Sequence, residues 1–314
     1  MKEIGGYIEI NSFKGGLYHN QALRLNCGRN CLEYLIEAND IKKIWLPRLI
    51  CDSLVQRCEK NNVEIGWYSV DETLKSHIPD INDQDWLFLV NYYGQLQKEE
   101  INDIKRNHKN IICDNTQAFF VKPDLDINTL YSCRKYFGVS DGAYLYTQRH
   151  LKRNLKIDYS YDRIGFLLGR YEKDASEFYN EYVMNNDRFI EEPIKQMSKL
   201  TENILRSIDY EYVKEIRTKN WNTLNERLKK YNNLMLLETK GAFSYPLLLN
   251  NGKELRKKLI ENKIYVPTLW PNVIENQENK IEKYLALNIL PLPCDQRYNE
   301  EDMNYIADVI QKFK

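Results

Sequence analysis

Short apolar runs alternate with amphipathic stretches along the first half of the chain. The apolar runs lie at 42–47, 63–70, 85–94 and 111–113. Apolar residues at helical spacing occur at 31–36, before the first run, and at 49–60, and a further helix is predicted at 98–107. Near-continuous apolar runs of this length are typical of strands that are buried on both faces of a parallel sheet. Strands that alternate with helices of this size predict βαβ units.

The second half of the chain has a different pattern. Between residues 151 and 230, tyrosine and charged residues dominate, and helical periodicity over 187–207 and 212–231 predicts two long connecting helices. Further elements are expected as a strand at 241–249, a helix at 253–263, an extended sheet-edge segment at 264–271, a strand at 284–293 and a final helix that begins within 298–303. We therefore expect a large domain over 1–230, with an N-terminal arm, and a small α/β domain over 231–314.

Composition narrows the class of protein. The 314 residues suffice for one large domain and a smaller one. Lys+Arg and Asp+Glu are both 45, so the formal net charge is zero, and the charge excess expected of a nucleic-acid binder is missing. No apolar run is long enough to span a bilayer, and the segment MKEIGGYIEINSF has no signal-peptide core. We expect a soluble, cytoplasmic protein without a membrane or nucleic-acid partner.

The seven cysteines and four histidines do not form a metal-binding pattern. No two cysteines form a C-x-x-C pair, and the histidines lie far from one another in sequence. Zinc sites usually show tighter ligand spacing. We expect buried free thiols in a reducing compartment and no metal site.

A carboxylate and an amine follow two consecutive predicted strands. Asp114 ends the strand IICD, and Lys135 comes 21 residues later, just past the strand that spans 128–133. In an open α/β sheet, the carboxyl ends of the strands are where ligands bind. Two charges near loops could also be ordinary surface residues.

This pair suits one cofactor in particular. Pyridoxal phosphate needs a lysine that holds it as a Schiff base and a carboxylate that keeps its ring nitrogen protonated. Lys135 and Asp114 would fill these roles, Gln117 could bond the ring hydroxyl, and Ser132 could donate to the phosphate. The Gly28-Arg29-Asn30 turn begins a predicted helix. Its free N–H groups and its dipole form an anion site, although the same turn also fits an ordinary helix start.

Six segments, in order along nearly the whole chain, resemble the DegT/StrS-type aminotransferases, a family of fold-type-I pyridoxal-phosphate enzymes. They are CGRNCL (27–32), IWLPRLICDSLV (44–55), VNYYGQ (90–95), CDNTQAF (113–119), SCRKYFGVSDGAYLYT (132–147) and NILPLPCDQRYNEEDMNYI (288–306). CDNTQAF matches the family's Glu-Asp-Ala-Ala-Gln-Ala motif, and the segment 132–147 resembles the part that carries the Schiff-base lysine. The chain departs from the family in three ways: only three residues separate Ser132 from Lys135, aliphatic residues and a cysteine stand at 49–51 where a ring-stacking aromatic is common, and the chain is shorter than usual.

The resemblance implies a fold-type-I transferase. Its large domain has a mainly parallel sheet flanked by helices, and a smaller C-terminal α/β domain follows. It assigns Lys135 to the Schiff base, Asp114 to the pyridine nitrogen and Gln117 to the ring hydroxyl. The phosphate falls to Gly28, Arg29, Asn30 and Ser132. Tyr92, Tyr93 and Arg134 are weaker candidates for contacts with the ring, the substrate or a phosphate, and solvent exposure is an equal possibility for Arg134.

The implied activity is transfer of an amino group from a donor such as glutamate to a keto sugar, expected to be nucleotide-linked, in surface-polysaccharide or natural-product biosynthesis. The implied assembly is a homodimer with active sites at its interface, where the tyrosine-rich helices after residue 151 would lie. Three alternatives stay open: a sugar dehydratase of the same family, which has histidine in place of Lys135; a cysteine desulfurase-like enzyme, for which no cysteine is well placed; and a non-catalytic regulator with the same fold.

Overall fold

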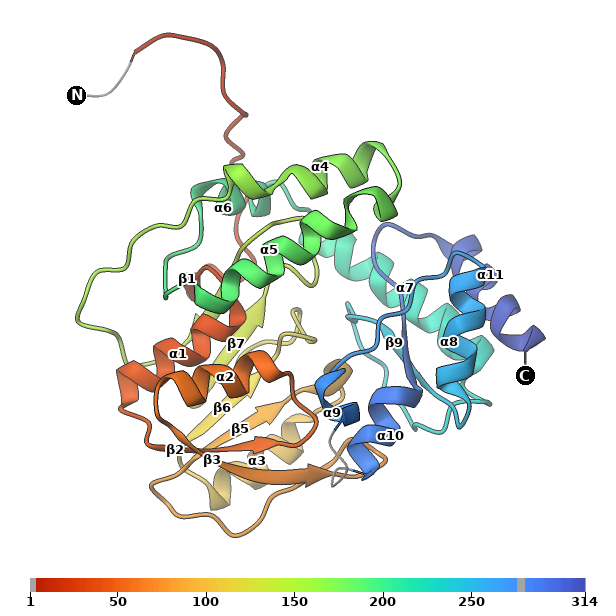
Figure 1. Cartoon of the computed structure of the whole chain (residues 1–314), viewed down its shortest axis with the longest axis horizontal. Coiled ribbons are helices and arrows are strands. Elements are labelled where there is room, and N and C mark those ends of the chain that lie inside the picture. The colour runs from red at the N-terminus through yellow and green to blue at the C-terminus, as the bar shows by residue number, and fades with distance from the viewer. Residues whose placement is uncertain (1–3, 276–279, 314) are drawn as a thin grey trace.

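The computed structural model describes residues 4–275 and 280–313, arranged as two sheets with their covering helices (Figure 1). The strands are β1 (Leu23–Leu25), β2 (Lys43–Pro47), β3 (Glu64–Val70), β4 (Ser76–His77), β5 (Trp86–Val90), β6 (Ile111–Asp114), β7 (Asn128–Ser132), β8 (Ala143–Tyr146), β9 (Tyr245–Leu248) and β10 (Ile289–Leu292). The α-helices are α1 (Gly28–Asn39), α2 (Asp52–Lys60), α3 (Lys98–Asn107), α4 (Gly165–Glu172), α5 (Tyr179–Glu191), α6 (Lys199–Leu205), α7 (Tyr210–Leu228), α8 (Gly252–Glu261), α9 (Asn272–Glu275), α10 (Lys280–Asn288) and α11 (Glu300–Lys312). Short 3-10 turns are η1 (Tyr92–Gly94), η2 (Tyr161–Arg163) and η3 (Ala175–Phe178).

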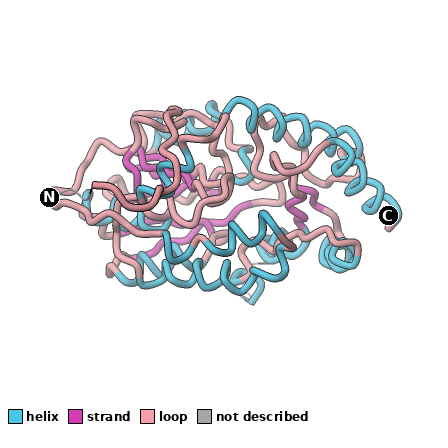
Figure 2. The backbone as a smooth tube through the Cα atoms, turned by 90° about the horizontal axis from the view of Figure 1, so that it is seen from above, coloured by secondary structure: helices cyan, strands magenta, loops and turns pink. Residues whose placement is uncertain are grey.

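The main sheet has eight strands in the order β1-β8-β7-β6-β5-β2-β3-β4. Its centre is parallel, because β3, β2, β5, β6 and β7 pair in parallel along that row. The outer strands β1, β8 and β4 run antiparallel to their neighbours. Helices lie on both sides of the strands (Figure 2). The predicted mainly parallel sheet flanked by helices is thus confirmed.

The alternation of side chains along β5 shows how the two faces are covered. Phe88 packs into the cluster beneath α1 and α2. Leu87 and Leu89 pack into the opposite cluster, together with Ile101 and Ile104 of α3. Successive side chains of a strand point to opposite faces, so a strand covered on both sides must be apolar throughout. This double burial explains the unbroken apolar run that predicts the strand.

A second sheet pairs β9 with β10 in antiparallel fashion near the C-terminal helix. Its core includes Trp221, Leu224 and Leu228 of α7, together with side chains of α8 and α11. The predicted division of the chain after residue 230 stays a prediction, and the C-terminal half of α7 packs on this second core. Within the described residues, no helix is both long and apolar enough to cross a membrane.

Four predicted elements differ from the structure. The helix expected over 187–207 is broken at 192–198, which separates α5 from α6. The expected strand at 284–293 is helical up to Asn288 and becomes a strand only at β10. The segment 264–271 forms no strand, and the arm expected to be irregular contains the edge strand β1. The other main predicted elements appear in their predicted order, and α3 matches its predicted bounds.

Candidate active site

Asp114 and Lys135 lie at the same edge of the main sheet. Asp114 is the last residue of β6, and Lys135 comes three residues after the end of β7. These strands are parallel neighbours, with Asp114 opposite Leu130, so their carboxyl ends meet. Asp114 is buried, whereas Lys135 is exposed and its Nζ lies 5.7 Å from the ring centroid of Phe243, just before β9. The lysine thus stands where the two sheets approach each other.

Thr116 connects the two charged groups. The Nζ of Lys135 donates a hydrogen bond to the hydroxyl of Thr116 at 2.9 Å. The backbone N–H of Thr116 donates to Oδ1 of Asp114 at 2.8 Å. Burial raises the pKa of Asp114, because a charged carboxylate loses hydration; the charge of Lys135 and hydrogen bonding by Thr116 oppose this rise. The site therefore holds a buried carboxylate whose charge depends on its neighbours.

The start of α1 lies beside this group. A Cβ on Gly28 would lie 3.7 Å from the methyl carbon of Thr116. Cys27 precedes the helix in an extended conformation and provides no side-chain cap, and the N–H groups of Asn30 and Cys31 already bond the carbonyl of Cys27. The first N–H groups of a helix have no intrahelical acceptor, so those of Gly28 and Arg29 are available for an anion.

The side chain of Asn30 is already in use. It is fully buried, and its amide nitrogen donates to Oδ1 of Asn26 at 2.9 Å and to the carbonyl of Pro193 at 2.8 Å. The amide therefore ties α1 to the chain beyond α5. The predicted phosphate donor Asn30 is therefore a side chain whose amide nitrogen already bonds other parts of the protein.

Gln117 is buried and orders the turn after β5. Its Oε1 accepts from the backbone N–H of Tyr93 at 2.9 Å, and Tyr93 has a left-handed φ of 54°. In the described chain, the amide nitrogen of Gln117 has no acceptor and can donate elsewhere. Ser132 is half-buried at the end of β7 and makes no side-chain hydrogen bond to a described residue. Both residues keep a donor free.

The remaining candidates point into packed regions. Tyr92 donates its hydroxyl to the carbonyl of Leu49 at 2.6 Å, and the rings of Tyr92 and Tyr93 meet Trp270 edge-on. The guanidinium of Arg134 lies 4.8 Å from the ring centroid of Phe189 and bonds Asn186, both on α5. Burial lowers the pKa of Arg134. Arg134 is thus directed toward α5 and away from solvent.

No protein-family model and no curated protein sequence matches the chain. Its structure matches a sugar aminotransferase, CalS13, from Micromonospora echinospora, with 12% identity and a TM-score of 0.64 over 93% of this chain and 87% of that one. Helicobacter pylori PseC, an aminotransferase of pseudoaminic acid biosynthesis, matches with 14% identity and a TM-score of 0.63 over 93% and 86%. The fold is that of the DegT/StrS-type sugar aminotransferases. An E. coli GDP-4-keto-6-deoxy-D-mannose-3-dehydratase with bound hydrated PLP also matches, with 14% identity and a TM-score of 0.63 over 92% and 87%.

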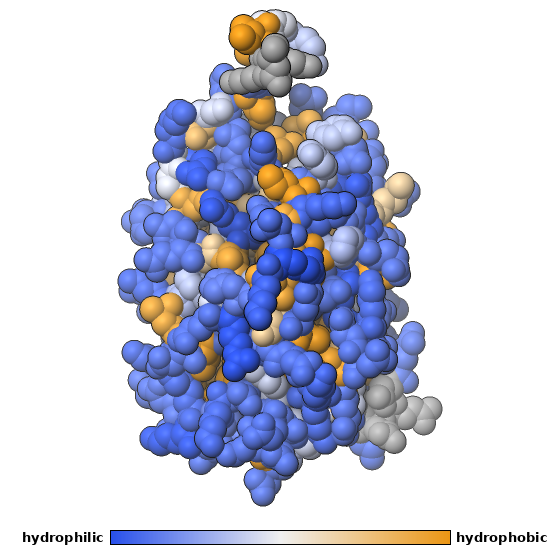
Figure 3. All heavy atoms as spheres, turned by 90° about the vertical axis from the view of Figure 1, so that its left-hand side faces the viewer, coloured by the Kyte–Doolittle hydropathy of each residue, from blue (hydrophilic) through white to orange (hydrophobic). Residues whose placement is uncertain are grey.

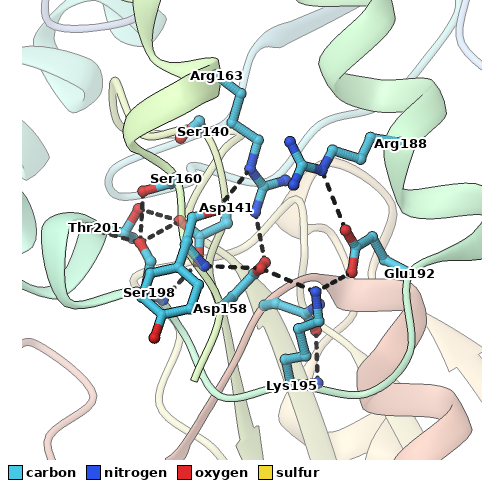
Figure 4. A network of polar contacts seen from close by, with 12 residues as sticks. Ser140, Asp141, Asp158, Ser160, Arg163, Arg188, Glu192, Lys195, Ser198 and Thr201 are labelled. Atoms are coloured by element: carbon cyan, nitrogen blue, oxygen red, sulfur yellow. Dashed lines mark hydrogen bonds and ion pairs between the residues drawn. The ribbon is translucent and has the colours of Figure 1, made fainter. Parts of the chain in front are cut away.

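A buried polar network holds the turn after Lys135 in place (Figure 4). The sequence alone did not predict this network. The buried carboxylate of Asp141 accepts from the N–H and the hydroxyl of Ser198, both at 2.8 Å, and from the hydroxyl of Thr201. Next to it, Gly142 donates its N–H to the carbonyl of Asn26 at 2.6 Å. Burial raises the pKa of Asp141, while these hydrogen bonds oppose the rise. The network joins the lysine turn to the starts of α1 and α6.

A second part of the network fastens the excursion that carries α4 and α5. Asp158 is buried, and its carboxylate pairs with Arg163 at 2.5 Å and with Lys195 at 3.3 Å. Asn185 of α5 donates its amide to the carbonyl of Ser140 at 2.9 Å. The excursion is thereby fixed over the turn that follows the lysine.

We expect Asp141→Ala to lower the free energy of unfolding by about 3 kcal/mol. Hydrogen bonds to a charged acceptor each contribute about 1.5–3 kcal/mol, and the substitution leaves the N–H of Ser198 and the hydroxyl of Thr201 buried without partners. Urea denaturation followed by circular dichroism measures the change. Asp174→Ala, at an exposed position of the same excursion, is the control and is expected to shift stability by less than about 0.5 kcal/mol. Equal stability of the two variants would contradict the anchoring role of Asp141.

The cysteines are all free, and all except the half-buried Cys51 are buried. Burial raises the pKa of Cys113 and Cys133, so neither thiol is activated as a nucleophile. Among residues 4–275 and 280–313, no cluster of three histidine, cysteine, aspartate or glutamate side chains is placed to hold a metal ion.

Proposed function

We propose that the protein is a pyridoxal-phosphate-dependent aminotransferase that passes an amino group from a donor such as glutamate to a keto sugar, nucleotide-linked, in surface-polysaccharide or natural-product biosynthesis. The observation that carries this proposal is the pairing of an exposed lysine amine with a buried carboxylate at one sheet edge, beside free N–H groups at a helix start. The fold neighbours that are sugar aminotransferases support the same assignment.

The donor set fits this cofactor. The Nζ of Lys135 would hold it covalently, and the carboxylate of Asp114 would bond the protonated ring nitrogen. The N–H groups of Gly28 and Arg29 suit a phosphate, and the free amide donor of Gln117 suits the ring hydroxyl. When bound, the cofactor supplies an electron sink for the carbanion at the donor's α-carbon.

The chain's own residues carry the proton transfers. The Nζ of Lys135, once free, would act as the base that takes the proton from the donor's α-carbon and as the acid that returns a proton. The carboxylate of Asp114 would favour the protonated form of the ring nitrogen, within a buried site where electrostatic attraction is strong. Thr116 orders both groups through its two contacts.

A dehydratase remains the second candidate, because one fold neighbour is a sugar dehydratase. That branch of the resembled family has histidine at the position of Lys135, so the lysine favours amino transfer. A non-catalytic relative would not need both Asp114 and Lys135.

The test is the release of 2-oxoglutarate from glutamate by cofactor-loaded protein without an acceptor. The proposal expects one equivalent per site. Cofactor binding without release from glutamate or other amino donors would favour dehydratase chemistry, and a failure to bind cofactor would favour the non-catalytic alternative. Keto-sugar nucleotides are then screened as acceptors.

We also propose that the protein is a homodimer. Exposed apolar side chains gather on α4, α5 and their connection, namely Leu168, Tyr171, Tyr179, Tyr182 and Met184. The N-terminal arm adds Ile4, Tyr7 and Ile8, each more than 90% exposed, and it stands clear of the body (Figure 3). Exposed apolar side chains that are concentrated on a few elements are typical of protein interfaces.

Sedimentation of two matched variants tests this interface. Met184→Glu, on α5, is expected to convert a dimer into monomers, because it places a charge in the apolar contact. Met235→Glu replaces another exposed methionine away from this surface and is expected to leave the dimer intact. A wild-type monomer, or a dimer that tolerates Met184→Glu, would count against the proposal.

A further inference from the structure

Thr116 lies at the centre of the candidate site and is almost fully buried. Three site elements meet at this residue. Its hydroxyl accepts from the Nζ of Lys135, its backbone N–H bonds the carboxylate of Asp114, and its methyl group faces Gly28 at the start of α1. Among the candidate site residues that the structure describes, Thr116 alone contacts all three.

The direction of the hydrogen bonds follows from the groups involved. A lysine ammonium only donates, an ionised carboxylate only accepts, and a hydroxyl does both. The amine of Lys135 therefore donates to the hydroxyl of Thr116, and the backbone N–H of Thr116 donates to the carboxylate of Asp114. One residue thus binds both charged groups, the amine through its side chain and the carboxylate through its backbone.

The hydroxyl at this position is a departure from the motif that the segment resembles. In the Glu-Asp-Ala-Ala-Gln-Ala motif that CDNTQAF resembles, the position of Thr116 holds alanine, which has no hydroxyl. The two groups would then have to be held by other contacts. The four-carbon side chain of Lys135 is exposed and has many rotamers, so an anchor for its amine restricts it strongly.

We propose that Thr116 is a positioning residue, whose hydroxyl anchors the amine of Lys135 beside the carboxylate of Asp114 for capture of the cofactor. The proposal rests on the proposed function in one respect, since it assigns these two groups to pyridoxal phosphate. The contacts of Thr116 with the two groups do not depend on that assignment. They can be tested with and without the cofactor.

Three variants separate the hydroxyl from the shape of the side chain. Thr116→Val keeps the shape and removes the hydroxyl, Thr116→Ala removes both branches, and Thr116→Ser keeps the hydroxyl. The first readout uses cofactor-free protein, in which the titration of Asp114 is followed through its side-chain carboxyl carbon by NMR. Without this anchor the charged amine of Lys135 is no longer held near Asp114. Because that charge lowers the pKa of Asp114, the pKa is expected to rise further in Thr116→Val and Thr116→Ala. Thr116→Ser is expected to titrate like the wild type.

The second readout is the rate at which added pyridoxal phosphate becomes covalently bound, followed by its absorption change. Capture is expected to be about tenfold slower in Thr116→Val and Thr116→Ala, which corresponds to one net hydrogen bond, and close to the wild-type rate in Thr116→Ser. An unchanged titration and capture rate in Thr116→Val would overturn the proposal. If even the wild type captures no cofactor, the proposed function fails, while the carbon titration still decides whether Thr116 couples to Asp114.

Discussion

Lys135→Ala is expected to abolish amino transfer. General acid–base catalysis by a positioned side chain contributes about 10²–10⁴-fold, and here the same side chain would also hold the cofactor covalently. The fall in kcat should therefore reach at least about 10³-fold, close to the background. Initial rates of 2-oxoglutarate formation with a keto acceptor, and the loss of the absorption band of lysine-bound cofactor, measure both effects.

Lys122→Ala is the matched control for this prediction. Lys122 is exposed in the loop that connects β6 to β7, and its removal is expected to change neither rate nor spectrum. Retention of the band in Lys135→Ala would assign the cofactor to another lysine. Retention of activity without the band would point to a different chemistry at this sheet edge.

Asp114→Asn is expected to lower kcat by about 10²–10³-fold while cofactor still binds. This is the range found when one preorganised electrostatic group is removed from an active site. The amide keeps the size of the carboxylate but lacks the charge that holds the ring nitrogen protonated. Single-turnover rates with glutamate measure the loss, and a rate within threefold of the wild type would contradict the role of Asp114.

The same substitution is expected to stabilise the cofactor-free protein. Because burial raises the pKa of Asp114, the folded protein binds this proton more tightly than the unfolded chain does. Its contribution to the free energy of unfolding therefore falls as the pH rises from the ordinary carboxyl range through the raised value. Asp114→Asn should unfold at a higher temperature than the wild type at neutral pH, and this advantage should shrink in mild acid. A constant difference across pH would assign the effect to packing.

Much of the fold could be predicted because short segments of the sequence determine many of its strands and helices. A strand such as β5 is buried on both faces, so its sequence is apolar throughout and stands out from the polar stretches around it. The helix predicted at 98–107 likewise matches the bounds of α3. Asp114 and Lys135 could be placed at one edge because parallel strands bring their carboxyl ends together.

The wrong secondary-structure predictions concern segments whose conformation depends on contacts between distant parts of the chain. The helix expected over 187–207 breaks because residues 192–198 bond instead to Asn26, Asn30 and Asp141, which are 50 to 170 positions away along the chain. Local periodicity carries no sign of these partners. The start of the expected strand at 284–293 is rich in good helix formers, and the structure places it in α10.

The residues of the site also divide into those that local sequence predicts and those that depend on distant contacts. The order of Asp114 and Lys135 is visible in the sequence, but the role of Thr116 depends on a lysine 19 residues away that strand pairing brings beside it. Asn30 was predicted to bind the phosphate, and the sequence did not indicate that its amide bonds the chain just beyond α5. The only indication of this role in the sequence is that Thr116 is a polar residue between the predicted site residues Asp114 and Gln117.

The most direct test of the central claim is to identify the lysine that takes the cofactor. Protein loaded with pyridoxal phosphate is reduced with borohydride, digested and analysed by mass spectrometry for the phosphopyridoxyl group. We predict a single modified position, Lys135, at close to one equivalent per chain. Modification of another lysine, or none above the level of a denatured control, would contradict the assignment of this sheet edge as the active site.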